Sequence, residues 1–428
     1  MPAPPTSHRI GFVSTRFLGT DGVTLEAAKW AEVFAGFGHQ NYWFAGKLGT
    51  PPEASILCEK AFFGHPEVAD LQGQLFGTPT RDRSLTDRIH ALKDGLKDAL
   101  YGFVEEFGID LLVPQNVLAL PMHVPLGLAV TEFIAETGIA TIAHHHDFSW
   151  ERERFATTCV PEMLEAAFPP SFARRFEHCV INSPAARELA RRRGVSATVV
   201  PNVFRFESVP PAPDAYSRGL RDAFGIAPDE TLVLQPTRIV QRKGIEHAID
   251  LVGQLQASGR RVCLVVSHLA GDEGMDYLAT LQQRAARASI RMLLVGERVC
   301  HQRGTDALGQ NLYTLGDVYQ AADLVTYPSL YEGFGNAFLE AVYYRCPILI
   351  NRYPIYLHDI GPLGFQVVEI DNIVTPATVA AVEELLDDAS LAADRADHNY
   401  ALATRHFSFA ILAQNLEHRL HSLFALSG

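Results

Sequence analysis

The stretch at residues 328–341 constrains the fold more than any other part of this chain; it runs Pro-Ser-Leu-Tyr-Glu-Gly-Phe-Gly-Asn-Ala-Phe-Leu-Glu-Ala. An apolar run at 322–327 precedes it and predicts a buried strand, and residues 337–344 predict a helix. The stretch is therefore a strand-to-helix turn, and its Gly333 and Gly335 allow the backbone to approach a ligand closely. Because the first N–H groups of the helix point out of such a turn, the arrangement suits an anionic ligand.

Charged residues in this turn and in a second loop extend the anion-site hypothesis. Glu332 in the turn and Glu340 in the helix are two acceptors for hydroxyl groups of one ligand. Each alone is also explained without a ligand, Glu332 as a carboxylate favoured by the helix dipole and Glu340 as a solvated helix residue. Arg238 and Lys243 flank a loop after another apolar strand, where two fixed cations would hold a diphosphate and stabilise its charge as it leaves. Arg242 is better explained as a surface cation.

Alternating strands and helices predict an α/β fold with two domains. The chain has 428 residues, which is too long for one ordinary hydrophobic core. A strand at 8–14, a helix at 24–37 and a strand at 40–45 predict the start of a doubly wound domain. A Pro-rich piece at 209–213 predicts a linker, and strands at 231–235 and 262–267 predict a second domain after it.

The two charged loops together resemble the retaining glycosyltransferases of family 4. In that family E-G-F-G is followed by an acidic residue eight positions after the first, as in Glu332 to Glu340, and R-x-x-x-x-K-G precedes it, as in Arg238 to Gly244. The resemblance implies a GT-B fold, with two Rossmann-like domains that face each other across a cleft. The expected domains are 1–208, for the acceptor, and 209–404, for the nucleotide-sugar, with a C-terminal helix at about 405–428 packing back on the first.

The resemblance also assigns roles to the residues of the donor site. Arg238 and Lys243 would bind the diphosphate, Glu340 would accept from the ribose hydroxyls, and Glu332 would hold the donor sugar. Further donor contacts are expected from Gly22, which lies after the first strand where the family has Gly-Gly and this chain has Asp21-Gly22, and from Gly333, Phe334, Gly335 and Asn336. The diphosphate would meet preorganised cations, so neither a metal nor a cofactor is expected.

The histidine run at 144–146 has two interpretations. Neighbouring side chains of an extended segment point to opposite faces, so only His144 and His146 could share a metal ion, and a third ligand is missing from the segment. The family resemblance instead matches His146-Asp147 to a His-Asp pair whose histidine lines the cleft beside the transferred sugar. His146 therefore joins Glu332, Arg238 and Lys243 in the expected catalytic set, in which neither Glu332 nor His146 need be a nucleophile or a base.

A weaker resemblance concerns the acceptor. Residues 20–26 and 144–154 look similar to mannosylglucosyl-3-phosphoglycerate synthases. That similarity implies an acceptor with a carboxylate or phosphate that Arg16, Arg152 and Arg154 would face. Asp21 and His146 complete the expected acceptor residues.

Composition restricts the partners and the compartment. The net charge of -13 argues against a nucleic-acid-binding surface and against electrostatic attachment to an anionic membrane. The six cysteines are scattered without a C-x-x-C pair, as is typical of buried thiols in a reducing cytoplasm, and no apolar run approaches the 18 residues of a membrane span. We therefore expect a cytoplasmic protein with a small soluble acceptor; the sequence does not indicate an oligomeric state.

The sequence favours a metal-independent, retaining hexosyltransferase that moves a sugar from a nucleoside-diphosphate sugar to a soluble acceptor, either neutral or anionic, such as a sugar, sugar phosphate or glycosylglycerate. Three alternatives remain, and the first two keep the same fold but change the reaction. A GT-B epimerase would release no nucleoside diphosphate in the presence of acceptor, and a phosphorylase would require inorganic phosphate or a cofactor. A non-catalytic protein would bind a nucleotide-sugar without forming a product.

Overall fold

The computed structural model describes residues 7–19, 21–172, 174–270 and 274–424, so the last residues of the predicted C-terminal helix, 425–428, lie outside the described residues. Contacts divide the described chain into two compact units, with changes from one to the other between Asn202 and Val203 and between Ser408 and Phe409. The N-terminal domain combines the residues before Val203 with those from Phe409 onward, and the C-terminal domain contains the residues between. The expected boundaries at 208 and about 405 lie a few residues from these positions.

The N-terminal domain is built on a seven-stranded parallel sheet with the order β3-β2-β1-β4-β5-β6-β7. Its strands are short and strongly apolar, and β4 and β5 are buried along their whole length, as expected for a parallel sheet covered on both faces. The strands are β1 (Arg9–Val13), β2 (Gln40–Ala45), β3 (Ser55–Leu57), β4 (Leu111–Pro114), β5 (Ala140–His145), β6 (Phe176–Val180) and β7 (Ala197–Val199).

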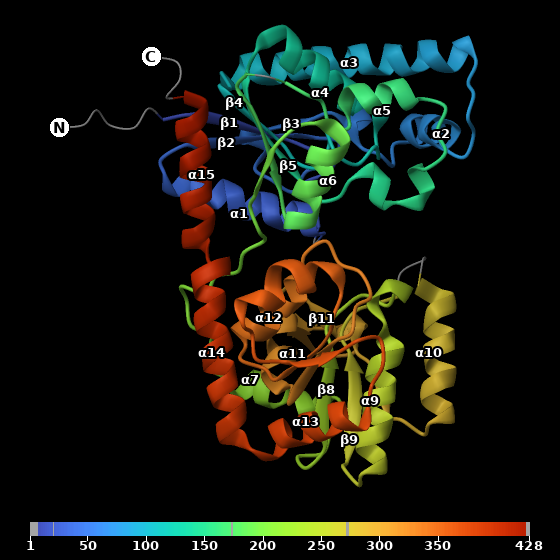
Figure 1. Ribbon diagram of the computed structural model, residues 1–428, viewed down its shortest axis with the longest axis vertical. Coiled ribbons are helices and arrows are strands. Elements are labelled where there is room, and N and C mark those ends of the chain that lie inside the picture. The colour runs from blue at the N-terminus through green and yellow to red at the C-terminus, as the bar shows by residue number, and fades with distance from the viewer. Residues whose placement is uncertain (1–6, 20, 173, 271–273, 425–428) are drawn as a thin grey trace, which may run out of the picture. The chain divides into compact units, whose positions relative to one another are not determined.

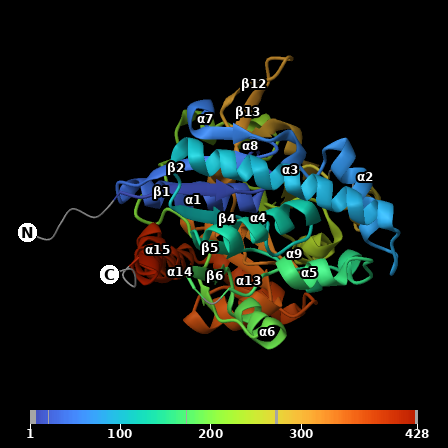
Figure 2. The same cartoon turned by 90° about the horizontal axis from the view of Figure 1, so that it is seen from above.

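Helices cover both faces of this sheet. On one face α3 and α4 lie side by side and seal the core with the fully buried Phe103, Val130 and Phe133 (Figure 2). On the other face α1 lies beside α15, which returns to this domain from the end of the chain (Figure 1). The helices are α1 (Gly22–Gly36), α2 (Pro66–Leu75), α3 (Arg83–Phe107), α4 (Val124–Thr137), α5 (Pro161–Ala167), α6 (Ser183–Arg193) and α15 (Phe409–Phe424).

The C-terminal domain has a six-stranded parallel sheet with the order β10-β9-β8-β14-β15-β16. The strands are β8 (Thr231–Gln235), β9 (Val262–Val266), β10 (Met292–Leu294), β14 (Leu324–Tyr327), β15 (Ile348–Asn351) and β16 (Val368–Ile370). A separate small sheet, which the sequence did not predict, has the order β11 (Val299–Cys300), β13 (Asn311–Thr314) and β12 (Gly304–Thr305).

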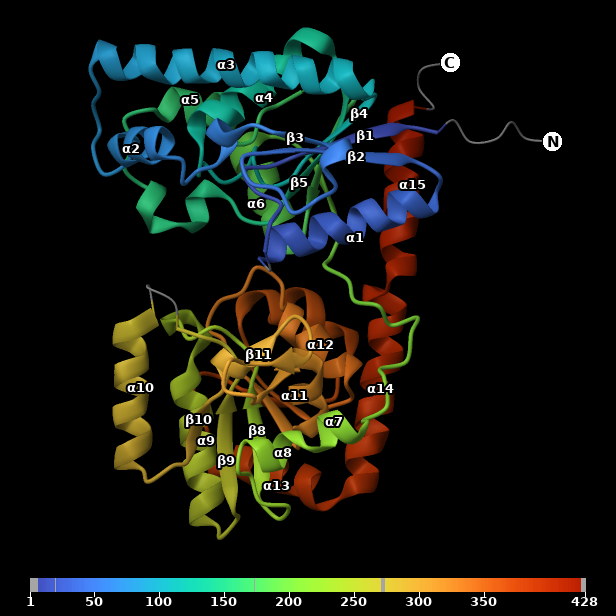
Figure 3. The ribbon, with the colours of Figure 1, turned by 180° about the vertical axis from the view of Figure 1, so that it is seen from behind.

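The helices of this domain alternate with its strands. Figure 3 shows α9 beside β9 and α10 along the outer side of α9, and the side chains of Ile249, Val252 and Leu255 on α9 are buried in the core. The helices are α7 (Ala215–Arg218), α8 (Leu220–Ala223), α9 (Ile245–Ala257), α10 (Met275–Arg287), α11 (Leu315–Ala321), α12 (Asn336–Tyr343), α13 (Pro376–Asp387) and α14 (Ala389–Phe407). The predicted fold class, two doubly wound α/β domains, is confirmed.

Each sheet has a point at which the strand order reverses. In the N-terminal domain the chain runs outward from β1 to β3 on one side and from β4 to β7 on the other. In the C-terminal domain it runs from β8 to β10 and from β14 to β16. Ligands of open α/β sheets bind outside the carboxyl ends of the strands at such a point. A ligand site is therefore expected at the loops after β1 and β4 and at those after β8 and β14.

Candidate active site

The loops after β8 and β14 carry the predicted donor residues, and in the structure they touch each other. The 3-10 turn η5 (Gln241–Lys243) lies in the first loop and the E-G-F-G turn in the second. The backbone N–H of Leu330 donates to the carbonyl of Arg242 at 2.8 Å. Gly244 follows η5 with φ +59°, and a Cβ on it would lie 2.4 Å from the carbonyl oxygen of Pro328. This approach requires glycine at position 244, both for its left-handed backbone and for the space.

Glu332 is the centre of an ion cluster between these loops. Lys243 Nζ contacts its Oε1, and Arg242 Nη1 donates to its Oε2 at 2.9 Å and to the carbonyl oxygen of Tyr331 at 3.2 Å. Glu332 and Lys243 are buried, whereas the Arg242 side chain is one-third exposed. The interpretation of Arg242 as a surface cation is therefore wrong, because its guanidinium pairs with the carboxylate of the turn.

The charges of this cluster are mutually dependent. Burial opposes ionisation of Glu332, but Lys243 and Arg242 outweigh it and hold the pKa of this carboxyl below its ordinary value. Burial lowers the pKa of Lys243, and the Glu332 carboxylate works against that fall. Glu332 is thus a buried anion that stays charged through its cations, and Lys243 is a cation that stays charged through Glu332.

Arg238 and His268 lie near Lys243. Arg238 is exposed on the loop after β8, and its charge adds to the lowering of the Lys243 pKa. His268 follows β9; burial, with Lys243 and Arg238, lowers its pKa to about 4, so its imidazole is neutral at neutral pH. Its Nδ1 lies 2.9 Å from the hydroxyl of Ser267. A neutral histidine that the sequence did not distinguish from a packing residue is thus within electrostatic range of both expected cations.

The remaining predicted donor residues lie along the second loop and α12. Gly335 precedes α12 with φ +143°, and a Cβ there would lie 2.5 Å from the hydroxyl of Tyr353. Tyr353 donates to the carbonyl of Phe334 at 2.8 Å, and Phe334 itself is buried. Glu340 lies on α12, where Oε2 accepts from the hydroxyl of the buried Tyr319 at 2.9 Å. Asn336 begins the helix, one residue earlier than predicted.

In the N-terminal domain Gly22 begins α1 and Asp21 caps it. Asp21 Oδ1 accepts from the backbone N–H of Thr24 at 3.1 Å, and Oδ2 accepts from the Thr24 hydroxyl at 2.8 Å. Arg16 Nη2 also donates to Oδ2, at 3.0 Å. The carboxylate of Asp21 thus has a structural task at the helix start, and it holds the Arg16 guanidinium beside that start.

His146 is held by a residue that sequence reasoning passed over. The side-chain oxygen of Asn116, after β4, accepts from the backbone N–H groups of His146 at 3.0 Å and Asp147 at 3.2 Å. Asn116 has φ 59°, a conformation that asparagine tolerates better than most residues. Burial lowers the pKa of His146 to about 4 despite the raising effects of Asp147 and Asp21, so the imidazole is neutral at neutral pH.

The other histidines of the run face different partners, as the strand alternation predicts. His144 stacks on Trp30, with ring centroids 4.1 Å apart, and its Nδ1 lies 2.9 Å from the side-chain oxygen of Gln115. The His146 ring centroid lies 4.3 Å from that of His144. His145 points the other way, and its Nε2 lies 2.9 Å from Nδ1 of His178.

The two arginines that follow have separate surroundings. Arg152 Nη2 donates to Asp147 Oδ1 at 2.8 Å, so its guanidinium lies beside the His146-Asp147 turn. Arg154 is exposed; its guanidinium carbon lies 4.6 Å from the ring centroid of Phe155, and Nη2 lies 2.7 Å from Met122 Sδ. The structure therefore groups Arg16, Asp21, His146 and Arg152 near the carboxyl ends of β1, β4 and β5, with Arg154 further along the chain.

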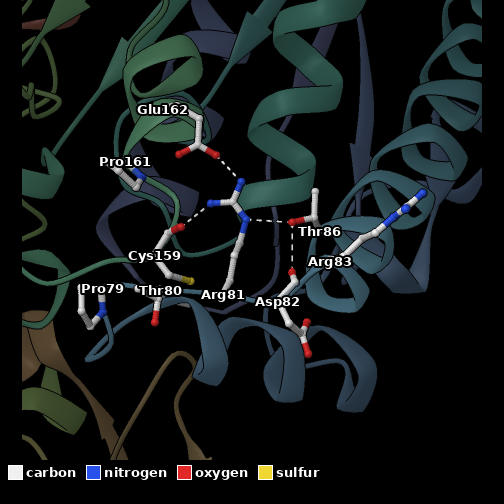
Figure 4. A pocket seen from close by; sticks show the side chains of 9 residues that line it. All are labelled: Pro79, Thr80, Arg81, Asp82, Arg83, Thr86, Cys159, Pro161 and Glu162. Carbon is white, nitrogen blue, oxygen red and sulfur yellow. Dashed lines mark hydrogen bonds and ion pairs between the residues drawn. The ribbon is translucent and has the colours of Figure 1, made fainter.

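One surface hollow of the N-terminal domain has none of the predicted site residues in its lining (Figure 4). It is lined by Arg81 and its neighbours before α3 and at the start of α5. Arg81 Nε donates to the hydroxyl of Thr86 at 2.9 Å, and its two other nitrogens contact the carbonyl oxygen of Cys159 and the carboxylate of Glu162. Two nitrogens thus link Arg81 to the start of α5 and the residues before it, and the third links it to α3.

Comparison with known proteins agrees with this geometry. The family model described as glycosyl transferases group 1 matches residues 218–401. Mannosylglucosylglycerate synthase of Petrotoga mobilis is 31% identical over 398 residues, which cover 85% of this chain and 86% of that protein. The protein of the same name from Thermotoga maritima is 31% identical over 419 residues, covering 91% and 94%.

A solved structure extends the likeness to the fold of the whole chain. Sucrose-phosphate synthase from Thermosynechococcus elongatus superposes with a TM-score of 0.66 at 15% identity, covering 98% of this chain and all of that one. Among the described residues, no helix has the length and apolar character needed to cross a membrane.

Proposed function

The chain belongs to the group 1 glycosyltransferases, and on that premise we propose that it is a retaining enzyme that transfers a hexosyl group from a nucleoside-diphosphate sugar to a glycosylglycerate. The observation that carries the proposal is the buried Glu332, paired with Lys243 at the point where the second sheet reverses its strand order. A buried ion pair costs desolvation energy, and ionisable groups with shifted pKa values at the carboxyl ends of strands are characteristic of functional sites.

In the proposed donor complex, Lys243 and Arg238 bind the diphosphate. The first amides of α12 point toward the donor, and Glu332 accepts from hydroxyl groups of the sugar. Glu340, oriented by the hydroxyl of Tyr319, accepts from the ribose. Negative charge grows on the diphosphate as the bond to the sugar breaks, and the two cations stabilise it. With that role filled by side chains, the reaction proceeds without a metal ion or cofactor.

The proposed acceptor site lies in the N-terminal domain. Arg16 and Arg152 are each fixed by a carboxylate next to the neutral His146, and both are only partly exposed. A guanidinium in such a position binds a carboxylate or phosphate through paired N–H donors. The two relatives are named for a product that contains glycerate, whose carboxylate fits these arginines.

Retention of configuration follows if the acceptor hydroxyl attacks on the face that the diphosphate leaves and a phosphate oxygen takes its proton. In that mechanism Glu332 positions the sugar and stabilises charge. His146 is neutral and forms one hydrogen bond with the sugar, either as donor or as acceptor. Neither residue forms a covalent bond to the sugar.

The test is to incubate the purified protein with UDP-, GDP- and ADP-hexoses and with glucosylglycerate, glucosyl-3-phosphoglycerate or the uncharged glucosylglycerol as acceptor. We expect release of one nucleoside diphosphate only with an anionic acceptor, an unchanged rate in EDTA, and a product whose new linkage has the donor's anomeric configuration by NMR. Binding without product would indicate a nucleotide-sugar binding protein. A requirement for inorganic phosphate would indicate a phosphorylase, and turnover unchanged in Glu332→Gln would refute the assigned site.

A further inference from the structure

Arg242 carries an inference that deepens the proposed function and rests on it. We propose that Arg242 is a positioning residue for the donor sugar: it holds the Glu332 carboxylate in place when Lys243 turns to the diphosphate. It makes no contact with substrate in this role and acts only through Glu332.

The two carboxylate oxygens of Glu332 have different cations. Lys243 takes Oε1, while Arg242 takes Oε2 and, with the same nitrogen, the carbonyl oxygen of Tyr331. The main chain of Arg242 also accepts from Leu330 N–H at 2.8 Å. Arg242 thus joins the β8 loop to the β14 loop through both its main chain and its side chain, and its guanidinium is fixed relative to the turn that Glu332 belongs to.

Lys243 is shared between two tasks, whereas Arg242 is not. Lys243 contacts Glu332. It also lies close enough to Arg238 for that charge to lower the Lys243 pKa, and close enough to His268 to lower the His268 pKa. A bound diphosphate attracts the Lys243 ammonium, so the bond between Lys243 and Oε1 of Glu332 weakens. Arg242, bonded to the opposite oxygen and to a fixed carbonyl, keeps its place.

Without Arg242 the buried carboxylate would keep one of its two bonded cations, Lys243. The groups that face Glu332 from the surrounding elements are Lys243, Arg242, Ser329, Tyr327 and Tyr353. Burial and the Glu332 charge raise the pKa of both tyrosines, so these remain neutral hydroxyls. A buried carboxylate that loses its cations takes up a proton or turns toward solvent. Either change removes an acceptor from the donor sugar.

The test compares Arg242→Gln and Arg242→Lys with wild type, each also in a Glu332→Gln background. We expect Arg242→Gln to lower kcat/KM for the nucleotide-sugar by about 10- to 100-fold, with Arg242→Lys recovering most of it. The affinity for the nucleoside diphosphate without its sugar should change less than about threefold. The acid limb of the kcat/KM profile should move to higher pH, because Arg242 helps to keep the pKa of Glu332 low.

In the Glu332→Gln background Arg242→Gln should have no further effect on kcat/KM, and it should lower the melting temperature less than in wild type, because only the hydrogen bond to the Tyr331 carbonyl oxygen remains to be lost. Arg284→Gln is the matched control, since this arginine pairs with Asp250 in the same domain and does not contact the two loops. If Arg242→Gln lowers the affinity for the nucleoside diphosphate as much as it lowers kcat/KM for the nucleotide-sugar, Arg242 binds phosphate. If the effects of Arg242→Gln and Glu332→Gln on kcat/KM are additive, Arg242 does not act through Glu332. Either result overturns the proposal. A wild-type protein inert toward every donor would refute the proposed function, and this role with it, while the melting temperatures would still report the ion pair.

Discussion

Gly244→Ala tests whether the approach of the two loops builds the donor site. The new Cβ would lie 2.4 Å from the carbonyl oxygen of Pro328, in a backbone conformation with φ +59°. The left-handed conformation costs a residue with a Cβ about 1–2 kcal/mol. Relief of the contact requires a shift of nearly 1 Å between η5 and the β14 loop, and overpacking of this kind costs about 1–3 kcal/mol. We expect a loss of about 2–5 kcal/mol in unfolding free energy.

Activity should fall more than stability alone explains. A misplacement of about 1 Å between groups that hold a substrate can cost about 100-fold in rate, and Lys243 and Glu332 lie on the two loops that must separate. Gly259→Ala is the matched control, because Gly259 also has positive φ, +98°, but nothing lies within 4 Å of its added Cβ. Denaturant unfolding and kcat/KM are measured for both variants. If Gly244→Ala is no less stable than Gly259→Ala and equally active, the loops do not depend on this contact.

Two further predictions concern the N-terminal domain and pH. Asn116→Ala removes the acceptor of two backbone N–H groups, so we expect a loss of about 1–3 kcal/mol in unfolding free energy and a raised KM for the acceptor. Asn116→Asp, which keeps the oxygen, should stay near wild type, and equal losses in both variants would contradict this role. Buried histidines whose pKa falls to about 4 stay neutral in the native state but take up a proton at about 6.5 when unfolded. Stability should therefore fall as the pH drops from about 6.5 toward 4, by up to about 1.4 kcal/mol per histidine and pH unit, and a melting temperature constant from pH 7 to 5 would refute it. These histidines are His123, His146, His178 and His268.

The elements of the fold were predictable where periodic apolar runs are long enough to be distinctive. β8 has the predicted bounds, 231–235, and α12 begins within one residue of its expected start. The order of the strands was not predictable, because parallel pairing joins segments far apart in the chain and leaves no local pattern. The small sheet of β11, β12 and β13 was missed because strands of two to four residues have no measurable alternation.

For the site, too, local sequence patterns were predictable and contacts between distant segments were not. The spacing of Arg238, Lys243, Glu332 and Glu340 was enough to propose these residues for the site, since a motif is a property of the sequence. Their ionisation is a property of the packing: Glu332 is a stable anion because the two loops meet at Gly244, so that Lys243 and a second cation, Arg242, reach its two oxygens. Arg242 was not predicted, because a charged residue next to a motif lysine is more often a surface group. The neighbouring sequence does not show that Arg242 differs from such a group. The contact that distinguishes it crosses from one strand end to another, so it becomes visible only when β8 and β14 are known to be neighbours.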